Sequence, residues 1–152
     1  MINDKMKMTG DVSLVLKGPD GQVKESREIK NLVVNAGLAY VISRMVGTAK
    51  AVMSHMALGA GTTAAAAGDT DLGSMLGSRE ALDSTTISGS NNEKVIYVAS
   101  FEAGDATGAV TEAGIFNASS SGDMLCRTVF AVVNKGANDS LTVTWTITLA
   151  AS

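Results

Sequence analysis

The sequence predicts a mainly β protein, an antiparallel β-sandwich of jelly-roll or immunoglobulin-like type with one short helix at about 36–46. The first observation is the final segment, 139–152, in which large apolar residues alternate with threonines. Alternation with a period of two places successive side chains on opposite faces of a strand. The second observation is a series of about seven or eight strand-like segments separated by turn residues, as in such sandwiches. The third is a single run with helical spacing.

The chain length favours one domain, since 152 residues are enough to bury a sizeable core. The opening Met1–Gly10 is polar, contains several methionines and lysines, and has no clear period. We therefore expect an N-terminal arm over residues 1–10, ordered on a neighbouring protein, followed by a single sandwich domain over residues 11–152.

The first third of the chain predicts a hairpin followed by the helix. Strands are expected at 12–16 and 23–34, joined by the turn Pro19-Asp20-Gly21. Asn35 is a suitable helix cap, and Gly47 a suitable stop. The apolar residues that follow Asn35 have the spacing of one helix face, which is expected to pack on the core; they are Leu38, Val41, Ile42 and Met45.

The remainder of the chain predicts further strands at 52–59, 78–87, 93–103, 109–117, 124–133 and 141–149. Residues 60–70 are small and of low complexity, which indicates a loop, and 72–76 a short helical turn. Gly114 lies inside a strand segment and predicts a bulge or a point of close packing.

The composition argues against several classes of partner. The net charge is −3 and no cluster of Lys and Arg exists, so we expect no nucleic acid. No apolar run reaches the roughly 18 residues that span a bilayer, so we expect no membrane. Cys126 is the single cysteine and cannot form an internal disulfide, which fits synthesis in a reducing cytoplasm.

The sequence holds no recognisable catalytic set, so we expect no enzyme, no cofactor and no metal. His55 is the single histidine, and no G-x-S-x-G motif accompanies it; a hydrolase using His55 is the weak alternative. The Gly59–Gly61 segment is expected to be a turn, because it lacks the G-K-[ST] of a phosphate loop. Asp69 and Asp71 are expected to be solvated loop carboxylates, and Cys126 a small buried residue.

Three groups of uncharged residues are candidates for an interface. Methionine adapts to contact surfaces, and flat rows of small or β-branched residues suit the packing of identical copies. Nearly all of the six aromatic residues, by contrast, lie in periodic segments and are expected in the core. The candidate interface residues are Met6, Met8, Ala64, Ala65, Ala66, Ala67, Thr142, Thr144, Thr146 and Thr148.

Several short motifs between Asn31 and Leu149 together resemble small virion structural proteins of tailed bacteriophages. They are N-L-V-V-N-A-G at 31–37, M-A-L-G-A-G-T-T at 56–63, G-D-T at 68–70, T-E-A-G-I-F at 111–116, R-T-V-F at 127–130 and T-V-T-W-T-I-T at 142–148. Proteins with this pattern include head decoration (cement) proteins and tail- or fibre-associated proteins.

The resemblance implies a β-sandwich that assembles as a symmetric homo-oligomer, a trimer, and carries no active site. It further implies a decoration protein on the outer surface of the phage head, where it would bind and stabilise neighbouring major capsid subunits. The alternative is a tail- or baseplate-associated adaptor that binds a host receptor or glycan.

Overall fold

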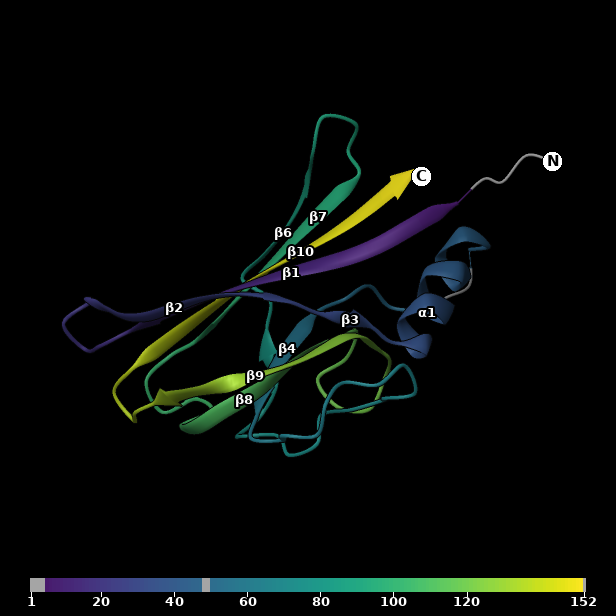
Figure 1. Ribbon diagram of the computed structural model, residues 1–152. Coiled ribbons are helices and arrows are strands. Elements are labelled where there is room, and N and C mark those ends of the chain that lie inside the picture. The colour runs from purple at the N-terminus through teal and green to yellow at the C-terminus, as the bar shows by residue number, and fades with distance from the viewer. Residues whose placement is uncertain (1–4, 48–49, 152) are drawn as a thin grey trace.

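The computed structural model describes residues 5–47 and 50–151 and confirms a β-sandwich. Two antiparallel sheets of five strands face each other, and one helix, α1 (Asn35–Met45), lies at the end where Met6 and Ala151 are paired (Figure 1). Within the described residues, no helix has the length and apolar character needed to cross a membrane.

The first sheet has the strand order β2-β1-β10-β7-β6. Its long middle strand β10 pairs with β1 along the whole length of both, from Met6 opposite Ala151 to Lys17 opposite Ser140. The bounds are Met6–Lys17 for β1, Val23–Lys30 for β2, Ser84–Ser88 for β6, Lys94–Phe101 for β7 and Ser140–Ala151 for β10.

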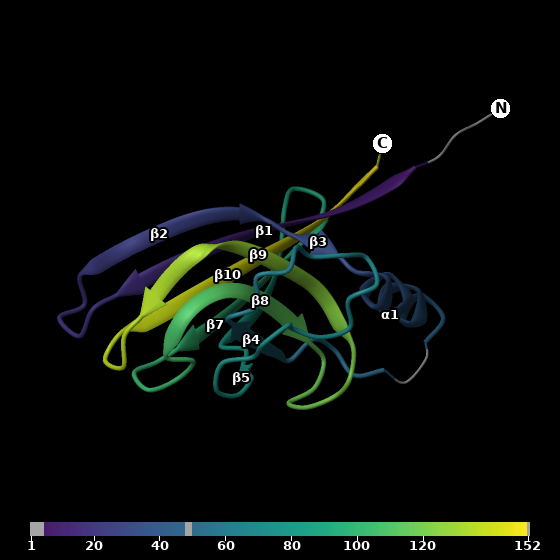
Figure 2. The same ribbon diagram turned by 60° about the horizontal axis from the view of Figure 1, so that its bottom comes forward.

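The second sheet has the strand order β3-β9-β8-β4-β5 and packs against the first, lying below it in Figure 1 and in front of it in Figure 2. Both of its edge strands are two residues long. The bounds are Leu32–Val33 for β3, His55–Gly59 for β4, Glu80–Ala81 for β5, Gly108–Phe116 for β8 and Met124–Lys135 for β9.

The core lies between the sheets and is supplied by alternate residues of each long strand. Leu141, Val143, Trp145 and Ile147 of β10 are all buried, as their alternation with threonine predicts. Trp145 is 0% exposed and packs in the same cluster as Phe101 of β7. Burying a large apolar side chain contributes about 1.5–3 kcal/mol, so this face of β10 fixes which side of the first sheet faces inward.

Two segments expected as single strands are each divided between the sheets. Residues 23–34 form β2 in the first sheet and β3 in the second, with the change at Asn31. Residues 78–87 likewise contribute β5 to the second sheet and β6 to the first. The expected helical turn at 72–76 is absent from the structure, where Met75 instead forms a single bridge with Gly59.

The expected arm is shorter than the sequence suggested. Residues 6–10 belong to β1 and pair with the last residues of β10, from Met6 opposite Ala151 to Gly10 opposite Ile147. Pairing with a neighbouring strand provides order that a local sequence period does not reveal. Residues 1–4 of the expected arm lie outside the described residues.

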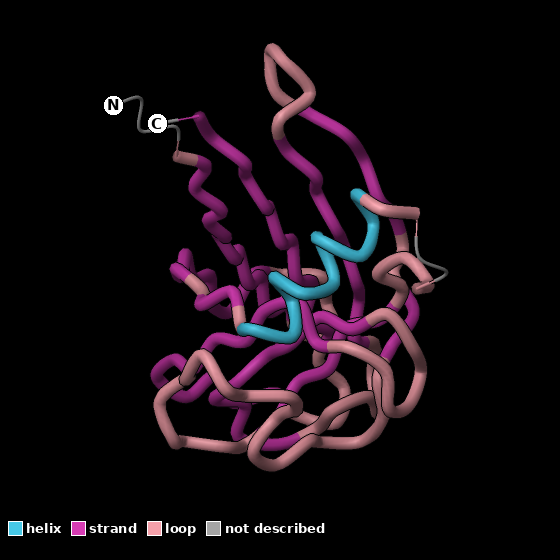
Figure 3. Tube along the Cα trace, turned by 90° about the vertical axis from the view of Figure 1, so that its right-hand side faces the viewer, coloured by secondary structure: helices cyan, strands magenta, loops and turns pink. Residues whose placement is uncertain are grey.

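Helix α1 has the expected length but buries a different face. Gly37 and Tyr40 are its buried residues, and a Cβ atom on Gly37 would lie 2.2 Å from the carbonyl oxygen of Leu125 in β9. Only a glycine allows this approach of helix to strand. The residue before the helix is Val34, without a side-chain cap hydrogen bond, so Asn35 is the first helical residue and not the cap. Figure 3 shows the helix crossing this end of the sandwich.

The apolar stripe expected to face the core therefore lies outside it. Leu38, Ile42 and Met45 are 46%, 58% and 70% exposed, and Val41 alone of the stripe is half-buried against the core. Close packing at Gly37 determines the orientation of α1 and leaves three large apolar side chains on the surface.

Candidate functional site

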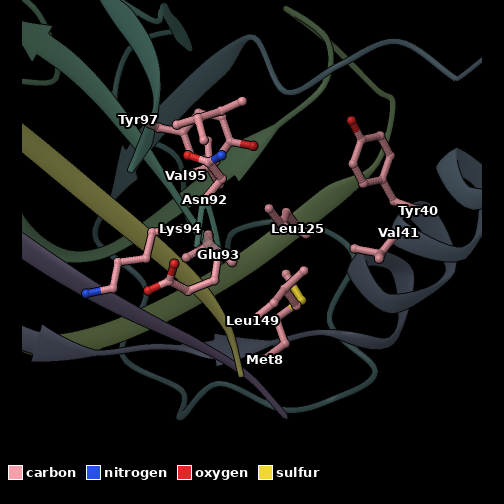
Figure 4. Close-up of a pocket in the computed structure, with 12 residues that line it drawn as sticks. Met8, Tyr40, Val41, Asn92, Glu93, Lys94, Val95, Tyr97, Leu125 and Leu149 are labelled. Atoms are coloured by element: carbon pink, nitrogen blue, oxygen red, sulfur yellow. The ribbon is translucent and has the colours of Figure 1, made fainter. Parts of the chain in front are cut away.

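The first sheet extends past the second at the end where Met6 and Ala151 are paired, and α1 lies opposite the inner face of this extension (Figure 1). The inner face is apolar because it continues the core side of β1, β7 and β10. Between the sheet and the helix lies a cleft with a volume of about 220 Å³. Figure 4 shows Tyr40 and Val41 of α1 on one side and Met8 and Leu149 below them. The cleft is lined by Met8, Tyr40, Val41, Ile87, Asn92, Glu93, Lys94, Val95, Tyr97, Leu125, Ile147 and Leu149.

A second groove, with a volume of about 450 Å³, borders the same helix. Met8, Val41 and Leu149 line both grooves, so the two form one continuous hollowed region around α1. The second groove is lined by Met6, Met8, Thr9, Gly10, Lys30, Asn31, Leu32, Val33, Leu38, Val41, Ile42 and Leu149.

We call the apolar residues Met6, Met8, Leu38, Val41, Ile42 and Leu149 of this region, together with Met45, the α1 surface. Met45 lines neither groove but continues the exposed apolar stripe of α1. Met6 is 65% exposed, comparable with Ile42 and Met45. Contiguous exposed apolar patches on soluble domains mark sites of contact with other macromolecules, and methionine adapts its shape to a partner. The α1 surface is therefore suited to docking.

The structure brings two of the three candidate interface groups close together. Met6 and Met8 belong to the α1 surface. Ala64 and Ala65 line a groove that shares Lys30, Asn31 and Leu32 with the groove beside α1. The methionines and the alanines thus occupy adjoining parts of one side of the molecule.

The threonines form a separate surface on the outer face of the first sheet. Thr142, Thr144, Thr146 and Thr148 are half-buried on the middle strand β10, pointing away from Trp145 and its neighbours. Opposite residues in an antiparallel pair share a face, so Ser13 and Val98 lie beside Thr144. This face is separated from the methionines by the thickness of the sheet.

A buried ion-pair network, which the sequence interpretation missed, holds the alanine loop, residues 60–76. The Glu112 carboxylate in β8 is 0% exposed and accepts hydrogen bonds from the backbone N–H groups of Gly61, Gly73 and Ser74 at 2.7–2.9 Å. Arg127 in β9 donates to the same carboxylate from Nε and Nη2, at 3.0 and 2.8 Å.

Arg127 also reaches the tip of the loop. Its Nη1 donates to Asp69 at 2.8 Å and its Nη2 to the carbonyl oxygen of Thr63 at 3.0 Å. Asp69 additionally accepts a hydrogen bond from the N–H of Ala66. The expectation of a solvated Asp69 was therefore wrong, because Arg127 is buried and needs carboxylate partners. Asp71 is exposed, with its carboxylate 3.7 Å from Arg79.

The electrostatics of this network favour the charged forms. Burial raises the pKa of Glu112, but hydrogen bonds from Gly73, Ser74, Arg127 and Gly61 outweigh burial and hold that pKa below its usual value. Burial lowers the pKa of Arg127, whereas the two carboxylates raise it, with a net increase. The pKa of Asp69 is lowered, first by the Ala66 N–H.

The glycines of the loop allow the carboxylate to approach the backbone. A Cβ atom on Gly59 or Gly61 would lie 2.4 or 2.5 Å from Oε1 of Glu112. Gly59 ends β4, and the expected turn at Gly59–Gly61 is not formed: the N–H of Ala60 donates to the carbonyl oxygen of Ser74, and Gly61 lies against the buried carboxylate. Gly114 is also a point of close packing, since its Cβ would meet Leu72, Phe116 and Met124 at 2.9–3.3 Å.

The residues considered for chemistry are dispersed. His55 in β4 has its Nδ1 atom 2.8 Å from the hydroxyl of the adjacent Ser54, and no hydrogen bond joins it to a carboxylate among the described residues. Cys126 is fully buried, and burial raises the pKa of its thiol to about 12, as expected for a packing residue. Over the ranges 5–47 and 50–151, no three metal-ligating side chains form a cluster.

Comparisons with known proteins give no further guide to the function of the α1 surface. No protein-family model, no curated protein and no solved structure matches the chain. The function is therefore inferred from the geometry of this surface and from the sequence motifs.

Proposed function

We propose that this chain is a head decoration, or cement, protein of a tailed bacteriophage. It would bind the outer surface of the head lattice through the α1 surface and stabilise neighbouring major capsid subunits. The observation that carries the proposal is the exposed apolar side of α1, where Leu38 and Ile42 line one groove together with Met6. The virion motifs between Asn31 and Leu149 direct the choice of partner.

The mechanism would be burial of apolar surface at many equivalent contacts. A standard interface of about 1,600 Å² can have an affinity anywhere from μM to pM, depending on its best-packed residues. A symmetric oligomer, a trimer by resemblance, would add avidity, because each bound copy raises the effective concentration of the next. Weak single contacts would then hold the lattice together.

The alanine loop supports a second contact beside the first. Ala64, Ala66 and Ala67 are exposed, and the loop that carries them is fixed by Glu112 and Arg127. Its backbone also joins the start of α1, because the N–H of Asn35 donates to the carbonyl oxygen of Ala67 at 2.8 Å. A partner that covers the α1 surface would meet a loop already in position, at a low cost in conformational entropy.

A tail- or baseplate-associated adaptor that binds a host receptor or glycan is the second candidate. Sugar-binding surfaces of that kind use exposed aromatic rings for stacking. Here every aromatic side chain is buried or half-buried. They are Tyr40, Tyr97, Phe101, Phe116, Phe130 and Trp145.

A binding experiment with matched variants tests the role of the α1 surface. Ile42→Lys places a charge in the surface, whereas Val23→Lys places one at an equally exposed apolar position, 58% in both cases, at the start of β2. Expanded heads lacking the protein are mixed with each variant and sedimented, and bound protein is measured. We expect Ile42→Lys to lose at least tenfold in occupancy at limiting concentration and Val23→Lys to bind normally. Equal binding of both variants would contradict the proposal.

The location of the protein in a reconstruction of the particle tests the choice of partner. We expect density for many copies over the head lattice, with α1 facing the capsid. Density for a few copies at the tail would overturn the decoration proposal and favour the adaptor.

A further inference from the structure

The edge strand β6 differs from every other sheet edge in the described part of the chain. Two edges, β3 and β5, are two residues long and offer little backbone for pairing. On the part of β9 that β3 leaves unpaired, Arg27 of β2 donates to the carbonyl oxygens of Ala131 and Val132. A third, β2, carries alternating charges, which natural proteins use to prevent strand pairing. Those charges are Lys24, Glu25, Arg27, Glu28 and Lys30.

β6 has neither form of protection. Its sequence, S-T-T-I-S over Ser84–Ser88, contains no charge, no proline and no glycine, and three of its five residues are β-branched. β7 is the one strand of the described residues that pairs with it. Thr86 and Ile87 are exposed, Ile87 to 69%. An exposed, uncharged edge of five residues is a template for another strand.

We propose that two copies of this chain pair through β6, as antiparallel strands related by a twofold axis at Thr86. The first sheets of the two copies, with five strands each, would join into one continuous sheet. In this register Thr86 lies opposite Thr86 of the partner copy, Thr85 opposite Ile87, and Ser84 opposite Ser88.

The choice of a second copy as partner follows from charge and from side-chain direction. The pairing places no like charges opposite each other, since Asp83 would face Gly89 of the partner copy. A twofold axis perpendicular to the sheet keeps the inner faces of both sheets on one side. Ile87 shares that face with Val95 and Ile147, so it would gain the apolar part of Thr85 of the partner copy as a neighbour.

The pairing would place two α1 surfaces on the same side of one sheet. Ile87 already lines the cleft beside Val41 and Leu149, so the new interface would adjoin the docking region. This consequence rests on the proposed function, whereas the pairing itself does not, because it is a property of the free protein.

Sedimentation equilibrium of the free protein tests the pairing without any capsid. Thr86→Lys would set two lysines opposite each other on the axis, and Ser26→Lys makes the same kind of change on the exposed edge strand β2. We expect the wild type and Ser26→Lys to have twice the mass of Thr86→Lys at the same concentration. A monomeric wild type at every concentration, or any oligomer unaffected by Thr86→Lys, would overturn the proposal.

Disulfide formation tests the register independently of any loss of stability. Opposite residues of an antiparallel pair have Cα atoms about 4.5–5.5 Å apart, within the range of a disulfide. Thr86→Cys should therefore give a covalent dimer under mild oxidation, because native Cys126 is fully buried. In Ser84→Cys the two sulfurs would be offset by four residues, about 13 Å, and should remain reduced. Equal cross-linking of both variants would contradict this register, and no cross-linking of either would contradict the pairing.

Discussion

The alanine loop and the α1 region lie side by side and are held in opposite ways. The loop is fixed by a buried carboxylate and guanidinium, Glu112 and Arg127, which satisfy backbone groups at Gly61, Gly73 and Ser74. Helix α1 is fixed by backbone contact at Gly37 and by the buried ring of Tyr40.

The loop and the helix differ in where their apolar side chains lie. Polar groups inside the molecule hold the loop at Gly61, Gly73 and Ser74, and its larger apolar residues Leu72 and Leu76 pack inward against the core. The helix is attached through Gly37, Tyr40 and the half-buried Val41, whereas the apolar side chains of Leu38, Ile42 and Met45 remain outside. The buried polar network therefore lies in the loop, and the exposed apolar side chains lie on the adjoining helix. Mutations in the two segments should accordingly have separable effects on stability and on binding.

The largest effect should come from removing the carboxylate that holds the loop. Glu112→Ala leaves the buried Arg127 without one of its two carboxylate partners and three backbone N–H groups without an acceptor. Breaking a buried ion pair in this way costs about 3–5 kcal/mol. Urea unfolding measures the loss, and Glu28→Ala on the exposed edge strand β2 is the control, expected within about 0.5 kcal/mol of wild type. A similar loss of unfolding free energy in both variants would show that the buried network contributes no more to stability than an exposed carboxylate does.

A smaller effect should follow from forcing the helix away from β9. Gly37→Ala adds a Cβ that would lie 2.2 Å from the Leu125 carbonyl oxygen. We expect a loss of about 1–3 kcal/mol, typical of overpacking. Gly68→Ala is the matched control, since nothing lies within 4 Å of its added Cβ. Calorimetry of the two variants checks the result, and an unchanged melting temperature for Gly37→Ala would show that α1 is not held at this point.

Acid should weaken the loop network gradually. The folded pKa of Glu112 is lowered from 4.5, so its contribution to stability is fully present above that value and is lost as the pH falls toward the folded pKa. The difference in unfolding free energy between wild type and Glu112→Gln should therefore shrink as the pH falls below about 4.5. Urea titrations at several pH values test this, and a constant difference would show that the charge of Glu112 contributes nothing.

The smallest effect on stability should come from the α1 surface. Met45→Lys changes a side chain that is 70% exposed at the last residue of the helix, where a cation interacts favourably with the helix dipole. We expect a change within about 0.5 kcal/mol in urea unfolding. A large loss would mean that Met45 stabilises the fold, and would weaken the case for a docking role.

The strands of the first sheet could be predicted because their signal is local. In β10 the alternation around Trp145 is complete, and it gave both the strand and its buried face. The division of residues 23–34 at Asn31 could not be predicted, since both halves are extended and only the sheet that they join differs. The extension of β1 to Met6 depends on its partner Ala151, far away in the sequence.

Part of the candidate site could also be predicted from local features of the sequence. Met6 and Met8 were selected by residue type, and the structure places them beside α1. The exposed stripe on α1 was expected inside, because helical periodicity does not specify which face a nearby glycine will bring against the sheet. The pair Glu112 and Arg127 left a signal, single charges within otherwise apolar strand segments, but their partnership across neighbouring strands required the register of β8 and β9.

The position of Trp145 supplies a built-in optical reporter. It is the single tryptophan of the chain, it lies in the middle of β10, and none of its surface reaches solvent. It lines neither groove beside α1. Its fluorescence emission should therefore shift to longer wavelength when the sandwich unfolds and stay constant when a partner occupies the helix. One unlabelled sample can in this way distinguish a variant that has lost its structure from a variant that has lost its partner.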